Sequence, residues 1–199
     1  SSDVCSSDLE NVIEEVTNGN FNTFADLFAG TGIVGRTYRE KGYYVISNDT
    51  QYKRVSGTSD ADVILNTGAY ASIYGNDGDD TINNRDISHW SYLDGGAGND
   101  YIYSDQGNYL TIRGGTGNDT IRFKSLYSNN HVIKYSSGDG NDYIEDSWGS
   151  PNCTLEIGGG TGTYSTQMSG SDKIVIVGSG KITLAGAMSS INIVGTYSS

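Results

Sequence analysis

The feature that most constrains this chain is a glycine- and aspartate-rich pattern that recurs at nearly constant spacing. Four segments align, at residues 75–83, 95–103, 114–122 and 137–145, and they read GNDGDDTIN, GGAGNDYIY, GGTGNDTIR and SGDGNDYIE. Their aspartates, Asp80, Asp100, Asp119 and Asp142, are 20, 19 and 23 residues apart. Self-similarity of this kind is typical of solenoids, in which each repeat adds one unit to a stack. We therefore predict one coil per period, with the glycine turn on one edge and a plain loop on the other.

The residue types in the pattern favour calcium as the ligand. Ca²⁺ takes roughly 6–8 oxygen ligands and accepts main-chain carbonyls as well as carboxylates. Glycines allow a short turn to direct its carbonyls inward, and the aspartates add negative charge. We expect the isoleucines that follow two residues later to point into the interior and the aspartates to point the other way; they are Ile82, Ile102, Ile121 and Ile144.

Composition favours a cation rather than a nucleic acid as the partner. The 199 residues contain 12 Lys plus Arg against 24 Asp plus Glu, which gives a net charge of −12. Clustered carboxylates repel one another unless a cation neutralises them. Only 35% of the residues are hydrophobic and 28 are glycine, so a thick apolar core is not expected. Cys5 and Cys153 have neither a CxxC spacing nor a partner histidine, so a disulfide framework or a zinc site is not predicted.

The four segments resemble the nonapeptide G-G-x-G-x-D-x-U-x of the repeats-in-toxin (hemolysin-type) family, in which U is a large apolar residue. The second and third copies match fully, whereas Asn76 and Ser137 each replace a glycine in the first and fourth. The resemblance implies an all-β, right-handed parallel β-roll or β-solenoid over residues 57–165, with about three calcium ions between four stacked turns. It assigns calcium to the carboxylates and main-chain carbonyls of Gly75, Asp77, Gly78, Asp80, Gly95, Gly96, Gly98, Asp100, Gly114, Gly115, Gly117, Asp119, Gly138, Gly140 and Asp142. It also implies a secreted bacterial protein that folds when it meets external calcium.

Two later stretches are similar to the repeats but lack their aspartates. GGTGTY at residues 159–164 has Tyr164 at the aspartate position, so we predict that it binds no metal. Residues 166–199 keep alternating apolar residues but contain a single aspartate, Asp172. Because the terminal repeats of solenoids close the open end of the stack, we predict that residues 166–199 form a metal-free β cap.

Residues 10–54 have a different pattern. TFADLF, GTGIVG and YYVIS predict a strand, a glycine turn that opens a helix, and a second strand that ends before Asp49. Gly30 and Asp49 are 19 residues apart, close to the spacing of about 20 expected for a nucleotide-binding unit. ADLFAGTGIVG and VISNDTQY resemble the S-adenosylmethionine-binding start of the adenine-specific DNA methyltransferases. This resemblance assigns the cofactor to Asp26, Phe28, Gly30, Gly32 and Asp49.

No enzyme activity is predicted for this segment. Those methyltransferases hold the target adenine with a D-P-P-Y type motif, and the single proline of this chain is Pro151, in SPNC. A strand–helix–strand unit also lacks the further strands against which it would pack. We therefore predict a truncated Rossmann-like fragment whose cofactor residues are vestigial.

Residues 1–9, SSDVCSSDL, resemble the translation of a short-read sequencing adapter, and we expect them to be disordered. With the abrupt change of pattern near residues 54–57, they predict a chimera of unrelated sequences; a genuine fusion is the alternative.

No run reaches the roughly 20 apolar residues of a membrane helix, and a signal-peptide pattern is not visible. The oligomeric state is left open.

Isolated histidines and aromatic residues allow other interpretations. His89 and His131 are predicted to be solvated loop histidines, and Trp90 and Trp148 to cover an edge of the solenoid. Outward-facing tyrosines of the repeats predict a side-chain ladder rather than a carbohydrate-binding face. Three functions are compatible with the sequence: a calcium-binding repeat module, an inactive methyltransferase fragment, and a structural or adhesive surface repeat.

Overall fold

The computed structural model describes residues 43–46, 53–66, 69–85, 89–105, 107–124, 130–147 and 152–198. These residues are mostly β-strand, which confirms the all-β prediction. Two short 3-10 helices, η2 (Gly158–Gly160) and η3 (Gly186–Ser190), lie near the C-terminus. Within the described ranges, no helix is both long enough and apolar enough to cross a lipid bilayer.

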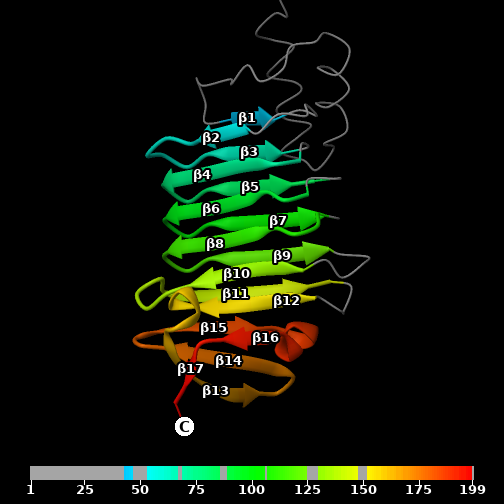
Figure 1. Cartoon of the computed structure of the whole chain (residues 1–199). Helices are drawn as coiled ribbons and strands as arrows, with labels where there is room; N and C mark the ends of the chain where they lie inside the picture. Colours follow the sequence, from blue (N-terminus) through cyan, green and yellow to red (C-terminus); the bar gives the residue numbers. More distant parts are fainter. Residues whose placement is uncertain are drawn as a thin grey trace, which may run out of the picture.

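Two parallel sheets form a stack, and the chain passes from one sheet to the other at each turn (Figure 1). The first sheet contains β1 (Tyr43–Ile46), β3 (Val63–Asn66), β5 (Thr81–Asn84), β7 (Tyr101–Asp105), β9 (Thr120–Lys124) and β11 (Asn141–Asp146), in this order. The second contains β2 (Lys53–Ser56), β4 (Ala71–Asp77), β6 (Tyr92–Ala97), β8 (Thr111–Thr116), β10 (His131–Tyr135), β12 (Cys153–Ile157) and β16 (Asn192–Val194). Each coil contributes one strand to each sheet, so the predicted parallel β-solenoid is confirmed.

The interior between the sheets is filled by one column of large apolar side chains from each sheet. In-register pairing aligns Ile64, Ile82, Ile102, Ile121 and Ile144 in the first sheet. The second sheet aligns Ile73, Leu93, Ile112, Ile133 and Leu155. All ten side chains are at most 1% exposed. Because each coil adds only about two such side chains, the apolar core is thin.

The prediction that the aspartates point away from the interior is wrong. Asp80, Asp100 and Asp119 are at most 2% exposed and share the interior side with the isoleucines. Residues i and i+2 of a strand lie on the same face, so an aspartate two positions before a buried isoleucine is also directed inward. The residues between them form the predicted outer ladder, in the order Thr81, Tyr101, Thr120, Tyr143.

Antiparallel strands extend the first sheet at its C-terminal end. β15 (Gly180–Leu184) pairs in parallel with β11, and β14 (Asp172–Val177) and β13 (Thr163–Ser169) follow in antiparallel order. β17 (Thr196–Tyr197) pairs with β13. Ile182 stands in register with Asp142, so a buried apolar residue occupies the next aspartate position. That this end binds no metal stays a prediction.

Three aromatic rings stack along the plain edge of the solenoid, opposite the glycine turns. Trp90 lies between Tyr70 and Tyr109, with centroid distances of 5.3 and 5.2 Å and interplanar angles of 5° and 4°. The three residues have φ angles of 59°, 52° and 54°, a left-handed backbone that costs bulky residues on the order of 1 kcal/mol or more. Both faces of Trp90 are covered, which agrees with its predicted role at the edge. Trp148 lies outside the described residues.

Replacing Trp90 should separate ring stacking from backbone strain. Trp90→Ala is expected to lower the free energy of unfolding by about 1–3 kcal/mol, because two ring contacts are lost. Trp90→Gly removes the same ring but also relieves the left-handed strain, so its loss should be smaller by roughly 0.5–1 kcal/mol. Thermal unfolding with calcium present measures both. Equal losses would show that the backbone at this position is not strained.

The prediction of a solvated loop position for His131 is wrong. His131 begins β10 and is 2% exposed, and its ring stacks on Phe123 at a centroid distance of 5.0 Å. Burial lowers its pKa to about 4, and its Nδ1 accepts a hydrogen bond from the N–H of Leu110 at 3.3 Å. His89 is half-buried and accepts one from the N–H of Asn108 at 3.1 Å. Both rings therefore help to join neighbouring coils.

Candidate metal site

The four predicted aspartates form one column along the edge of the solenoid that carries the glycine turns. This is the edge at which β4 passes into β5, on the left in Figure 1. The backbone N–H of each of the first three aspartates donates to Oδ1 of the aspartate one coil later. The distances are 2.8 Å from Asp80 to Asp100, 2.8 Å from Asp100 to Asp119 and 3.1 Å from Asp119 to Asp142. Hydrogen bonds to ionised carboxylates are stronger than those between neutral groups. One carboxylate oxygen per coil is therefore used to hold the next turn in register.

The second carboxylate oxygen of three aspartates has no hydrogen-bond partner. These buried atoms are Oδ2 of Asp80, Asp100 and Asp119. A Cβ built on Gly75 would overlap both Oδ2 of Asp80 and the carbonyl oxygen of Gly95 in the next coil, and the same arrangement recurs one coil later. Leaving such an atom unpaired in the interior costs about 1–3 kcal/mol or more. A cation that contacts the carboxylate and the carbonyl together would satisfy both.

Close stacking of the turns explains the glycines at the fourth position of the motif. Gly98 and Gly117 have φ angles of 135° and 138°, which L side chains rarely adopt. A Cβ on Gly98 would also overlap the carbonyl oxygen of Gly78 in the preceding coil, and one on Gly117 that of Gly98. Both the backbone conformation and the available space exclude larger residues. Main-chain oxygens of successive turns are thereby brought into one column beside the aspartates.

Burial raises the pKa of each of the four predicted aspartate carboxyls above its ordinary value near 3.8. The pKa values are about 7 for Asp80, about 6 for Asp100, about 7 for Asp119 and about 8 for Asp142. Loss of hydration is the largest cause, the hydrogen bond from the preceding aspartate opposes it, and neighbouring carboxylates raise the pKa further. Negative charge is therefore unfavourable in this column at neutral pH unless a cation is bound.

The stability of the metal-free chain is expected to fall as the pH rises from about 4 to about 8. Over this window the folded state binds more protons than the unfolded chain, because its carboxyl pKa values are raised. By linkage, stability then decreases as the pH rises, and the dependence ends near pH 4, where both states are protonated. Circular dichroism in a chelator at pH 5 and pH 8, followed by a thermal scan, measures this, and at pH 8 the chain is expected to be largely unfolded before heating. A lower midpoint at pH 5 would contradict the prediction.

A fifth aspartate, Asp62, extends the column at its N-terminal end, and the repeat pattern does not predict it. Its N–H donates to Oδ1 of Asp80 at 2.7 Å, and the residue is 1% exposed. Its turn, GTSDAD, lacks the second and fourth glycines of the motif. The remaining signal is the spacing of 18 residues to Asp80 and the isoleucine, Ile64, two positions later.

The turn of Asp62 differs from the others because it satisfies one carboxylate oxygen itself. Oδ2 of Asp62 accepts hydrogen bonds from the N–H of Thr58 at 2.5 Å and from its hydroxyl at 3.1 Å. Oδ1 is buried without a partner. Thr58 thus hydrogen-bonds to Oδ2 of Asp62, whereas the equivalent Oδ2 atoms of Asp80, Asp100 and Asp119 have no partner.

The remaining predicted ligands lie in the same turns. Asp77 is exposed there, at the end of β4. Gly138 and Gly140 flank Asp139, which is buried, accepts a hydrogen bond from the N–H of Ser136 at 2.7 Å and lies 3.4 Å from Arg113. Nowhere in the described ranges do three or more His, Cys, Asp or Glu side chains gather closely enough to hold a metal ion. An ion in these turns would therefore rely on main-chain oxygens.

The predicted cofactor residues Asp26, Phe28, Gly30, Gly32 and Asp49 lie outside the described residues. The strand expected at YYVIS is present as β1, and it pairs in parallel with β3 of the solenoid. β2 likewise pairs in parallel with β4. The sheets therefore begin before Gly57, and the domain boundaries drawn from the sequence stay a prediction.

Comparison with known proteins divides the chain into two parts. Residues 72–85, 91–110 and 111–122 match the RTX calcium-binding nonapeptide repeat, and residues 7–59 match the D12 class N6 adenine-specific DNA methyltransferases. Over 44 residues the chain is 48% identical to the Type II methyltransferase M.FokI of Planomicrobium okeanokoites, which covers 22% of this chain and only 7% of that protein. The chain thus carries RTX-type calcium-binding repeats, preceded by a short segment of D12-class methyltransferase sequence.

Proposed function

We propose that the repeat segment is a calcium-binding module in which ions between successive coils complete the fold. The observation that carries this proposal is the set of three buried Oδ2 atoms without a partner. Calcium prefers this mixture of carboxylate and carbonyl oxygens, and the match to RTX repeats supports the same ion.

The ions would lie in the turns of Asp80, Asp100 and Asp119, so we propose three sites. Each would take the free Oδ2 and carbonyls of the motif turns, which at Asp80 and Asp100 include the carbonyl of the first glycine in the next coil. Bound calcium supplies the positive charge that keeps these carboxylates ionised. The chain itself contributes the glycine turns, which allow the close approach, and the Oδ1 hydrogen bonds, which orient the carboxylates. The turn of Asp62, closed by Thr58, would begin the column, and that of Asp142 would end it.

Native mass spectrometry of the full chain, freed of metal and then equilibrated with calcium, tests this proposal. Three bound ions per chain are expected. Absence of specific binding at millimolar calcium would overturn the function, and a different saturating count would overturn the assignment of the three turns.

We further propose that the module works outside the cell, in keeping with the usual setting of RTX repeats. Extracellular calcium modules bind with dissociation constants of about 10⁻⁴–10⁻³ M, weaker than cytosolic sensors. A calorimetric titration that gave a submicromolar constant would contradict an extracellular trigger.

For residues 10–54 we propose no catalytic role, although this segment matches D12-class methyltransferases. The supporting observation is the absence of a D-P-P-Y type motif from the sequence. Incubation of the chain with labelled S-adenosylmethionine and DNA should transfer no methyl group to adenine.

We also propose a junction of unrelated sequences near residues 54–57. Continuous sequencing reads across codons 50–60 would argue against a chimera.

A further inference from the structure

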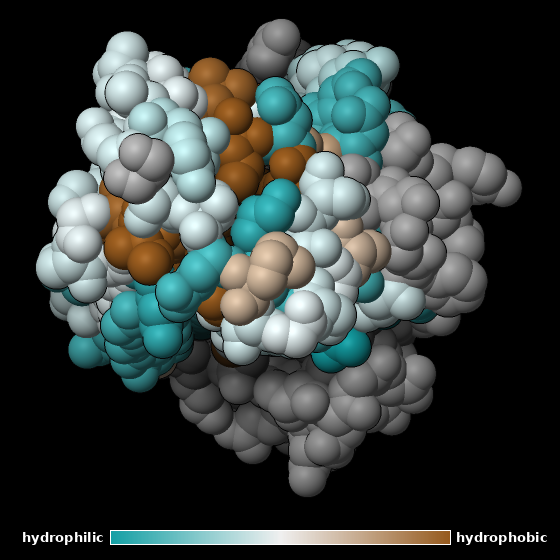
Figure 2. All heavy atoms as spheres, turned by 90° about the horizontal axis from the view of Figure 1, so that it is seen from below, coloured by the Kyte–Doolittle hydropathy of each residue, from teal (hydrophilic) through white to brown (hydrophobic). Residues whose placement is uncertain are grey.

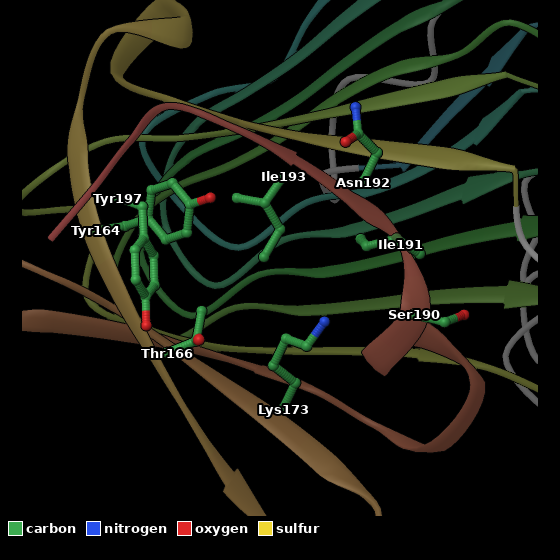
Figure 3. A pocket seen from close by; sticks show the side chains of 8 residues that line it. All are labelled: Tyr164, Thr166, Lys173, Ser190, Ile191, Asn192, Ile193 and Tyr197. Atoms are coloured by element: carbon green, nitrogen blue, oxygen red, sulfur yellow. The ribbon is translucent and has the colours of Figure 1, made fainter. Parts of the chain in front are cut away.

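A groove of about 450 Å³ lies at the C-terminal end of the stack, where β13, β14, β16 and β17 meet (Figure 3). Its volume is within the range of small-ligand sites, roughly 300–1,000 Å³. Figure 2 shows this end of the molecule, on which hydrophobic patches lie among hydrophilic surface. None of the lining residues belongs to the aspartate column. A role for this groove is therefore separate from calcium binding.

Two tyrosines form an aromatic wall of the groove. The rings of Tyr164 and Tyr197 meet edge to face, with centroids 5.5 Å apart and an interplanar angle of 70°. The two residues are in register on the paired strands β13 and β17, so the backbone fixes the wall. Ile193 projects beside the rings (Figure 3). Tyr197 is 57% exposed, which leaves much of its surface accessible to a ligand.

Polar side chains of β13, β14 and β17 face the same space, whereas that of Asn192 points away from the other side chains (Figure 3). Thr166 of β13, Lys173 of β14 and Asn192 of β16 line the groove together with the tyrosines. Their side chains make no hydrogen bond or ion pair with the described part of the chain, and the same holds for both tyrosine hydroxyls. Ser190 differs, because its hydroxyl donates to the carbonyl of Ala187 at 2.9 Å. Four polar side chains, those of Thr166, Lys173 and the two tyrosines, are thus available around an aromatic and apolar surface.

We propose that this groove binds a pyranose sugar unit, with a preference for one that carries a carboxylate. A sugar ring has apolar C–H faces, which suit the tyrosine rings and Ile193, and a rim of hydroxyls, which suit the free polar groups. The preference for a carboxylate follows from the ammonium group of Lys173, which has no ion-pair partner in the described part of the chain and would attract a negative charge. A fully apolar ligand would leave all four polar groups unpaired. A polyphosphate would meet a single lysine in a chain of net charge −12, and that combination disfavours it.

Calorimetric titration of the full chain in calcium, with folding verified by circular dichroism, tests the proposal. The probes are methyl glucuronoside, which carries one carboxylate and is acidic, and methyl glucoside, which is neutral and lacks only that carboxylate. We expect saturable binding of the acidic probe, at least fivefold tighter than the neutral one. Tyr197→Ala should weaken binding of both at least tenfold, whereas Lys173→Met should abolish the difference between them. Lys181→Met is the matched control, because Lys181 is exposed on β15 and does not line the groove.

Lack of binding of both probes overturns the sugar site, as does a loss in Lys181→Met equal to that in Tyr197→Ala. Equal affinities for the two probes would overturn the preference for a carboxylate. The readout is independent of the proposed calcium function. A chain that folds without calcium would refute that function, yet this titration could still be made on it.

Discussion

At pH 7.5 in a calcium chelator, the full chain is expected to lose most of its β-sheet circular dichroism and to regain it in excess calcium. The folded aspartate column holds carboxyls with pKa values of about 6 to 8. Ionising each of them in the unfilled column costs on the order of 3–6 kcal/mol, since their pKa values lie roughly 2–4 units above 3.8 and one pKa unit corresponds to about 1.4 kcal/mol. Several such costs together approach the whole stability of an ordinary domain, about 5–15 kcal/mol. The thin core of two sheets offers little to offset them.

Magnesium at the same concentration is the matched control for this experiment. Mg²⁺ is smaller, demands octahedral geometry and sheds its water reluctantly, so it should restore much less signal. Strand content that is unchanged by the chelator would refute the coupling of folding to calcium. Full recovery with magnesium would show that charge neutralisation alone is sufficient.

The variant Asp100→Asn is expected to have opposite effects with and without calcium. Asparagine retains an oxygen that can accept the hydrogen bond from the N–H of Asp80, but it removes a buried charge in the middle of the column. Without metal at pH 7.5, the folded state should gain on the order of 2–3 kcal/mol relative to the parent. With metal, the loss of a charged ligand should raise the midpoint of the calcium titration at least tenfold. Circular dichroism at a series of calcium concentrations measures both effects.

Asp105→Asn is the control, because it makes the same change of charge at the end of β7, away from the column. Its calcium midpoint should stay within about twofold of the parent, as expected for a partly exposed carboxylate. If the two variants shift the midpoint equally, net charge rather than the column would govern calcium binding. Destabilisation of the metal-free chain by Asp100→Asn would contradict the raised carboxyl pKa.

The repeat spacing predicts the solenoid because it reflects the length of one coil. Asp80, Asp100 and Asp119 are 19 or 20 residues apart, and the strands pair in that register. The turn of Asp62 is harder to predict, because Thr58 stands where the motif has its second glycine. The N–H and hydroxyl of Thr58 donate hydrogen bonds to the carboxylate of Asp62. Recognition of this turn requires the hydrogen bonds between coils, which only the folded chain reveals.

Features that depend on neighbouring coils are the least visible in the sequence. His131 resembles a loop residue until Phe123 of β9 is placed against its ring. The left-handed backbone of Trp90 is equally unexpected, because bulky residues rarely adopt it, and its ring stacks on residues of the neighbouring coils. The groove beside Tyr197 arises from the meeting of strands that are distant in sequence, β13 and β17.

The hydrogen bonds of the aspartate column all run in one direction, which gives the repeat array a head and a tail. Asp62 presents a free acceptor oxygen at the N-terminal end, whereas Ile182 ends the series at the other. A duplicated repeat placed before Asp62, or within the column, could donate its N–H to the next carboxylate and preserve the pattern. One placed after Ile182 would find no acceptor. Growth of such an array by gene duplication is therefore favoured at the head and inside, and the tail is where its length is fixed.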